Sequence, residues 1–205
     1  MGSPEFWLDA IEHLSSSDPR MGDIITQYRE PRLKPNGNVG RTLIKAVVGQ
    51  QISVQAADAV WSRMTDLLGQ VTPQSVLQVE IGDLRGCGLS MRKSEYITGI
   101  AKEWCGGLKE VDWSTLNEPQ VKDALMKIRG VGPWTVDMAL IFSLGLPDIF
   151  PTGDVGLLRA VEKNYAGGER LPLEDVISIS EPWRPYRTVA TWYLWRTIDP
   201  EPVNY

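Results

Sequence analysis

Apolar residues recur at three- and four-residue spacing along most of this chain, which is the periodicity of amphipathic α-helices. The stretch after Ser53 is the clearest case, because its apolar side chains fall on one helical face and Gly69 ends the run. Further helices are predicted around His13, at residues 39–49, after Thr72-Pro73, from Ser90 to Gly106, from Asn117 through Ile128, and at residues 134–144, 155–165, 173–179 and 183–197. No convincing alternating strand interrupts this pattern, so the sequence predicts an all-α fold.

The length of 205 residues suits one compact domain, with room for two lobes. Two segments rich in proline and glycine, Pro31–Gly37 and Gly145–Gly153, are the longest irregular stretches and are candidate hinges. The first six residues, Met1–Phe6, are interpreted as a remnant of an expression vector and are left out of the fold prediction.

The composition, 42% hydrophobic and 23% charged, is typical of globular proteins. The sequence shows neither a long apolar run nor a signal peptide, so we expect an intracellular protein without membrane contact. Cys87 and Cys105 have no CxxC partner, which excludes a four-thiolate iron–sulfur cluster or a cysteine-rich zinc site supplied by this chain. The single histidine, His13, lies in the predicted first helix, which argues against a histidine-dependent triad, and its being alone excludes a multi-histidine metal centre. Any catalysis is therefore expected to depend on carboxylates, hydroxyls, amines or main-chain groups.

The net charge of −5 argues against a broad electropositive surface for nucleic acid. Formal charge is an average, however, and a local strip of cations or main-chain amides can still bind phosphates on an acidic protein. Whether this chain binds nucleic acid therefore depends on where cations and main-chain amides are placed along it.

The motif Gly130-Val131-Gly132-Pro133 predicts two helices joined by a tight hairpin. The first helix ends at Gly130, and Pro133 supplies a fixed φ at the first position of the second helix. Because the two glycines have no Cβ, a phosphate can approach the main chain, and the amides at the start of the second helix add partial positive charge. Lys127 and Arg129 flank the turn as conventional cations. A plain turn in a helical bundle is the alternative explanation of the same pattern.

Asp154 follows the second irregular loop and begins an apolar-periodic helix. Its simplest role is an N-cap, in which the carboxylate accepts a main-chain N–H and stabilises the helix by about 1 kcal/mol. A helix N-terminus also favours the ionised carboxylate, and a fixed anion suits a reaction that develops positive charge. Both interpretations stay open from the pattern alone.

Five motifs along the chain can be considered together. They are Gly49-Gln50-Gln51-Ile52-Ser53, Gly88-Leu89-Ser90-x-Arg92-Lys93-x-Glu95-Tyr96, the Gly130–Trp134 hairpin, Phe150-Pro151-x-x-Asp154, and Trp183-Arg184-Pro185-Tyr186-Arg187 with Ala190 and Leu194-Trp195. In this order they resemble the helix-hairpin-helix DNA glycosylase superfamily, and its AlkA-type 3-methyladenine DNA glycosylase II branch in particular. The likeness extends over residues 7–199.

The resemblance implies two helical lobes flanking a DNA-binding cleft, with lobe one at residues 38–133 and lobe two at residues 7–37 and 134–205. It also implies that a nucleotide is flipped out of the duplex and that the bond between its base and deoxyribose is hydrolysed. The matching positions are Asp154 for the catalytic aspartate, Trp134 for the aromatic residue that stacks on the extruded base, Trp195 and Met138 for further pocket positions, and Gln51 for the wedge into the duplex. Relatives often have an apolar residue at the wedge position.

The resemblance also implies contacts to DNA and to a cation. The expected DNA contacts are Ser53, Arg92, Lys93, Arg129, Gly130, Val131 and Gly132, although an exposed pair such as Arg92 and Lys93 is more often simply solvated. The main-chain carbonyls of Ile128 and Val131 match a monovalent cation site of relatives, and no essential metal or cofactor is expected. The predicted partner is double-stranded DNA with alkylated bases, bound by a monomer in the bacterial cytoplasm or the eukaryotic nucleus.

The same comparison narrows the chemistry. Relatives that also cut the DNA backbone carry a lysine in a Gly-Val-Gly-x-Lys pattern, where this chain has Trp134, so a monofunctional hydrolase is predicted. A base of the 3-methyladenine or 7-methylguanine type is a good leaving group, so one carboxylate that stabilises an oxocarbenium-like sugar or activates water is sufficient. The alternative is a non-catalytic module that binds alkylated or bent DNA, in which Asp154 only caps its helix.

Overall fold

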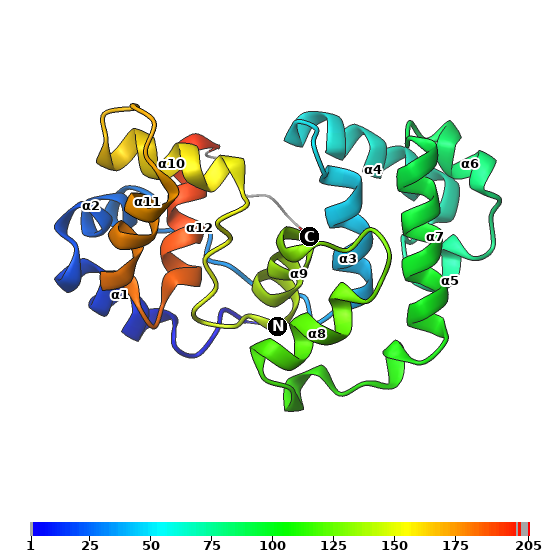
Figure 1. Cartoon of the computed structure of the whole chain (residues 1–205), viewed down its shortest axis with the longest axis horizontal. Coiled ribbons are helices and arrows are strands. Elements are labelled where there is room, and N and C mark those ends of the chain that lie inside the picture. Colours follow the sequence, from blue (N-terminus) through cyan, green and yellow to red (C-terminus); the bar gives the residue numbers. More distant parts are fainter. Residues whose placement is uncertain (1, 200, 202–204) are drawn as a thin grey trace. The chain divides into compact units, whose positions relative to one another are not determined.

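The computed structural model describes residues 2–199, 201 and 205, and the regular structure of this part of the chain is entirely helical (Figure 1). The α-helices are α1 (Trp7–Ser17), α2 (Pro19–Gln27), α3 (Val39–Gly49), α4 (Val54–Leu68), α5 (Pro73–Val76), α6 (Ile81–Gly86), α7 (Met91–Cys105), α8 (Glu118–Met126), α9 (Pro133–Ala139), α10 (Val155–Tyr165), α11 (Leu173–Ser180) and α12 (Arg187–Ile198). Shorter turns are η1 (Leu108–Glu110), η2 (Trp113–Thr115), the π-helical η3 (Leu140–Leu144) and η4 (Glu181–Trp183). The all-α prediction is confirmed. Within the described ranges, no helix has both the length and the apolar character needed to cross a bilayer.

The chain divides into two compact units. Of the described residues, 2–36, 140–199 and 201 belong to unit 1, and 37–139 together with Tyr205 belong to unit 2. The sequence predicted the second boundary before Trp134, whereas it falls after Ala139, at the end of α9. The physical reason is that α9 packs against α3 and α8, so its contacts belong to unit 2.

Unit 2 is built around α3, which packs against α4, α5, α7 and α9. Most residues of α3 are buried, and its two cations, Arg41 and Lys45, are half-buried. Gly40 is required here, because a Cβ at this position would lie 2.6 Å from the Trp104 ring. Gln50 and Gln51 follow directly after the C-terminal end of α3.

Unit 1 is built in the same way around α12, which packs against α1, α2 and α10. Residues 188–194 of α12 are all buried. The predicted start of this helix at Trp183 is wrong, since residues 181–183 form η4 and Arg184 is extended, with φ −63° and ψ 142°. Pro185 explains the difference, because a proline disfavours helical geometry in the residue before it.

Most predicted helix starts are confirmed by side-chain caps. Ser53, Ser90, Asn117 and Asp154 each accept the N–H of the residue three positions later. One predicted helix changes character within its span, because α9 ends at Ala139 and the chain continues as the π-helical η3. The sequence analysis missed α2, although Asp18 caps it and Pro19 occupies its first position.

The excluded N-terminal residues make ordered contacts with unit 1. The Phe6 ring stacks on Tyr186 with centroids 5.9 Å apart, and the Pro4 carbonyl accepts the N–H of Trp7. The described part of this segment therefore packs with the rest of unit 1.

Candidate active site

The carboxylate of Asp154 in unit 1 is held by two donors. Its Oδ1 atom accepts the main-chain N–H of Leu157 at 2.6 Å and the indole Nε1–H of Trp195 at 3.0 Å. The first bond is the predicted N-cap of α10, and the second comes from the central helix α12. Hydrogen bonds to a charged acceptor are about twice as strong as neutral ones, so this geometry fixes the direction of the half-buried carboxylate.

Trp195, which is predicted to line the base pocket, contacts two other residues of unit 1. Its half-buried ring stacks on Phe142, with centroids 5.8 Å apart and planes at 11°, while its N–H is directed to Asp154. Gly156 leaves room for this arrangement, because a Cβ there would lie 3.1 Å from the Asp154 Oδ1 atom. The sequence analysis did not identify Phe142 or Gly156, since no local pattern marks them.

The hairpin in unit 2 has the predicted turn with a shorter first helix. Helix α8 ends at Met126 rather than at Gly130, and the next residues form tighter turns in which Ile128 N–H donates to Leu125 and Val131 N–H donates to Ile128. Such tightening is common where a helix runs into a left-handed residue, and Gly130 has φ +90°. Pro133 is the first residue of α9, as predicted.

The two glycines of the hairpin have different surroundings. A Cβ on Gly130 would lie 2.2 Å from the Tyr96 ring, so packing alone requires glycine at this position. A Cβ on Gly132 would meet nothing within 4 Å, so Gly132 faces open space within unit 2. The alternative explanation, a plain helix–helix turn, accounts for Gly130 but gives no packing reason for Gly132.

Gln50 links the C-terminal end of α3 to the hairpin through hydrogen bonds. The sequence analysis did not single out this residue. Its side-chain amide donates to Thr135 Oγ1 at 2.9 Å and to the Gly130 carbonyl at 3.3 Å. The Lys93 ammonium donates to the carbonyls of Val48 and Gln50, at 2.7 and 2.8 Å. The last turn of a helix leaves its carbonyls without helical partners, and Lys93 satisfies two of them.

Gln51 and Ser53, both predicted to meet DNA, lie next to this junction. Exposed Gln51 has φ +60° and is the one non-glycine residue of the described chain in the left-handed region. Such a conformation costs of order 1–3 kcal/mol and is concentrated at functional sites. The Ser53 hydroxyl accepts the N–H of Ala56 as the cap of α4, so the structure gives it a local role.

The three candidate cations of unit 2 differ in their surroundings. The guanidinium groups of Arg92 and Arg129 each lie 5.8 Å from the Tyr96 ring, and the Arg129 side chain is 79% exposed. Lys93 is half-buried on its two carbonyls, and burial lowers its pKa. Contact of any of the three with phosphate stays a prediction. Arg92 and Arg129 are exposed, so their side chains are more accessible to a phosphate than that of Lys93.

The predicted base-pocket residues divide between the two units. Trp134 and Met138 are on α9 of unit 2, where Trp134 is half-buried and Met138 is buried. Asp154 and Trp195 are in unit 1. The structure thus brings Asp154 and Trp195 together directly, and the pocket that would join all four residues stays a prediction.

Asp137 on α9 is a carboxylate with a raised pKa. Buried Asp137 makes an ion pair with Lys122 of α8, with Oδ1 and Nζ 3.3 Å apart. Burial raises the pKa of Asp137, and the nearby Lys122 lowers it by a smaller amount. This pair links the two helices of the hairpin.

The hairpin carbonyls have the right chemistry for the predicted monovalent cation. The Ile128 carbonyl accepts the N–H of Val131 at 3.0 Å, but a carbonyl oxygen has two lone pairs and can also contact a cation. Across the described residues, no group of three or more histidine, cysteine or acidic side chains is arranged to hold a metal ion.

Comparison with known proteins places the chain in a family. The family model of the HhH-GPD superfamily base excision DNA repair protein matches residues 44–185. DNA-3-methyladenine glycosylase 1 of Schizosaccharomyces pombe is 33% identical over 197 residues, which cover 90% of this chain and 85% of the relative. A DNA-3-methyladenine glycosylase of Bacillus subtilis is 34% identical over 207 residues, which cover 93% of this chain and 67% of the relative.

A solved structure agrees with these sequence relatives. The Schizosaccharomyces pombe 3-methyladenine DNA glycosylase in complex with abasic DNA has a TM-score of 0.82 and 32% identity, covering 92% of this chain and 96% of that one. The chain belongs to the HhH-GPD superfamily of base excision DNA repair proteins. Within the superfamily it is similar to the 3-methyladenine DNA glycosylases, as the sequence motifs predicted.

Proposed function

We propose that this protein is a monofunctional DNA glycosylase that hydrolyses the N-glycosidic bond of alkylated bases in double-stranded DNA. The observation that carries the proposal is the position of the Asp154 carboxylate, which is held between the Leu157 N–H and the Trp195 indole. The names of the relatives, which are 3-methyladenine glycosylases from a bacterium and a yeast, support alkylated bases as the substrate class.

The reaction breaks the bond between C1′ of deoxyribose and the base nitrogen. An alkylated purine already carries positive charge, so it leaves with the bonding electron pair as a neutral base. Positive charge then develops on the sugar, and the Asp154 anion stabilises it. Water adds its oxygen to C1′ and loses a proton, either to Asp154 or to solvent, and the products are a free base and an abasic site.

The residues of unit 2 would bind the DNA and select the base. The main chain at Gly130, Val131 and Gly132 would contact a phosphate beside the open position at Gly132, and Gln51 would fill the gap left by the flipped nucleotide. Trp134 would attract a cationic base through its indole face, which is worth about 0.5–2 kcal/mol. This attraction favours an alkylated base over a neutral one.

Two lysines that could support lyase chemistry have other partners. Lys127, just after α8, pairs with Asp123 at 2.8 Å between two exposed side chains, and Lys163 donates to the Thr197 carbonyl at 2.6 Å. Neither occupies the hairpin position that Trp134 has in this chain. We therefore expect no covalent enzyme–DNA adduct when the reaction is treated with borohydride.

The test is the release of free bases from methylated duplex DNA by the wild-type protein and by Asp154→Asn. The asparagine Oδ1 can still accept from Leu157 and Trp195, so the variant keeps the hydrogen bonds and loses the charge. We expect release by the wild type and a loss of about 10²–10³-fold in the variant. Binding without release by the wild type would favour the non-catalytic module, in which Asp154 serves as a cap only.

A further inference from the structure

The loop that leads to Asp154 is bonded residue by residue to the first turn of α12. The buried Thr188 hydroxyl donates to the Leu146 carbonyl at 2.6 Å and accepts the Ile149 N–H at 2.9 Å, and the Thr188 N–H donates to the Pro147 carbonyl at 3.0 Å. One hydroxyl therefore serves as donor and acceptor at the same time. Valine has the same shape as threonine and can do neither, whereas serine keeps both functions.

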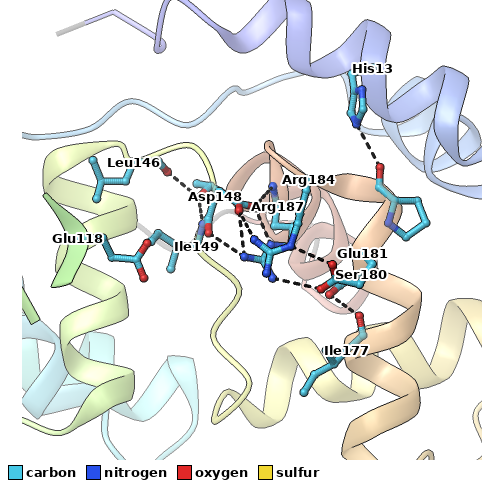
Figure 2. A network of polar contacts seen from close by, with 12 residues as sticks. His13, Glu118, Leu146, Asp148, Ile149, Ile177, Ser180, Glu181, Arg184 and Arg187 are labelled. Carbon is cyan, nitrogen blue, oxygen red and sulfur yellow. Dashed lines mark hydrogen bonds and ion pairs between the residues drawn. The ribbon is translucent and has the colours of Figure 1, made fainter.

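Asp148 of the same loop is held by two arginines. Its carboxylate accepts Nε and Nη2 of Arg187, at 2.6 and 3.0 Å, and Nη1 of Arg184 at 2.7 Å (Figure 2). The Arg187 Nη2 group also reaches the Asp148 carbonyl at 3.3 Å. The Arg187 side chain is only 13% exposed, so this two-point pairing is poorly screened and depends on the planar guanidinium.

We call Asp148, Arg187 and Thr188 the loop clamp. Past the clamp, Phe150 packs edge-on against Trp183 with centroids 6.0 Å apart, and the Pro151 carbonyl accepts the Asp154 N–H at 2.9 Å. The Asp154 carboxylate then receives the Trp195 N–H, which comes from the same helix as the clamp. The segment between Leu146 and Asp154 is thus attached to α12 at both of its ends.

We propose that Arg187 and Thr188 are positioning residues for the Asp154 carboxylate. They act through the loop and touch neither the carboxylate nor the substrate. The inference rests on the proposed function, because it concerns the chemical step that Asp154 serves. A shift of about 1 Å in a catalytic group can cost about 10²-fold in rate, so loosening the clamp should slow base excision. DNA binding by the hairpin of unit 2 should be unaffected.

Thr188→Val and Thr188→Ser form the matched pair for the test. Single-turnover excision from methylated duplex DNA measures the chemical step, and the dissociation constant for duplex with an abasic-site analogue measures binding. We expect Thr188→Val to excise at least about 10-fold more slowly, with binding unchanged, and Thr188→Ser to restore most of the rate. The control is Thr72→Val, which makes the same exchange at the cap of α5 in unit 2. It removes the hydroxyl that accepts the Ser75 N–H and should leave the rate within about two-fold.

A readout that does not need activity separates this inference from the proposed function. The Leu157 amide proton is bonded to Asp154 Oδ1, so its hydrogen exchange reports the position of the carboxylate. We expect faster exchange in Thr188→Val and no change in Thr72→Val. If the wild type released no base, the proposed function would be wrong. The exchange data would still test whether the loop clamp positions the Asp154 carboxylate.

Arg187→Lys is the second variant, for the case in which Thr188→Val does not fold. It keeps the positive charge and loses the two-point pairing to Asp148, so it should lower the excision rate and leave DNA binding unchanged. Wild-type rate and wild-type Leu157 exchange in a folded clamp variant would overturn the inference. An equal loss of rate in Thr72→Val would also overturn it, because the effect would then follow general stability.

Discussion

Gly130→Ala should destabilise the protein through two separable effects. The first is the backbone, because Gly130 has φ +90°, and placing an alanine in the left-handed region costs about 1–2 kcal/mol. The second is packing, because the new Cβ would lie 2.2–2.7 Å from three atoms of the Tyr96 ring. Overpacking of this kind costs about 1–3 kcal/mol, so the two effects together amount to about 2–5 kcal/mol. A typical domain has only about 5–15 kcal/mol of stability.

Urea unfolding of Gly130→Ala, with Gly132→Ala as the control, measures this loss. The control adds a methyl group two residues away that meets nothing within 4 Å, so it should change the free energy of unfolding by less than about 1 kcal/mol. In a Tyr96→Ala background the packing effect disappears, and Gly130→Ala should then cost only the backbone part. A loss below about 1 kcal/mol for Gly130→Ala, or an equal loss for both glycines, would refute this reasoning.

The same pair of variants tests the hairpin as a phosphate anchor. The methyl group of Gly132→Ala would occupy the open side of the turn, where a phosphate would approach the main chain. We expect weaker binding to duplex DNA with little change in stability. Unchanged DNA affinity in Gly132→Ala would remove the hairpin main chain from the proposed interface.

Three further predictions follow from other contacts. Trp195→Phe keeps an aromatic ring and removes the donor to Asp154, and a hydrogen bond to a charged group is worth about 1.5–3 kcal/mol, so single-turnover excision should fall by about 10-fold or more; an unchanged rate would contradict this. Asp137→Asn should raise the free energy of unfolding at pH 7, because burial raises the pKa of Asp137 and the folded chain therefore binds this proton more tightly than the unfolded chain. The gain should shrink as the pH falls through the folded pKa towards the ordinary value of 3.8, and a gain independent of pH would argue against ionisation as its cause. Arg92→Gln should lower the salt dependence of DNA binding by the equivalent of about one phosphate contact. Lys93→Met should instead lower the free energy of unfolding by about 1–3 kcal/mol, because it removes the donor to two carbonyls. A lower salt dependence in Lys93→Met and an unchanged one in Arg92→Gln would show that Lys93 contacts DNA.

The sequence predicted those parts of the fold that depend on neighbouring residues. The caps at Ser53, Ser90 and Asp154 could be predicted because a cap joins residues three positions apart. The start of α12 differs from the predicted one because the apolar periodicity continues across Pro185, whereas that proline keeps Arg184 out of the helical conformation.

The contacts that organise the candidate site join residues far apart in the chain. Gln50 reaches Gly130 across 80 positions, and Trp195 reaches Asp154 across 41. A single sequence contains no periodicity that pairs such positions, so the motifs named Asp154 and Trp195 without showing that they bond to each other. These contacts depend on how α3 packs within unit 2 and how α12 packs within unit 1, and that packing exists only in the folded chain.

The charge of Asp154 is the central claim, and one comparison tests it most directly. Single-turnover release of 3-methyladenine from duplex DNA is measured for the wild type and for Asp154→Asn, together with their affinities for duplex carrying an abasic-site analogue. The account predicts release by the wild type, a loss of about 10²-fold or more in the variant, and equal affinities. Equal release rates for the two proteins would contradict it.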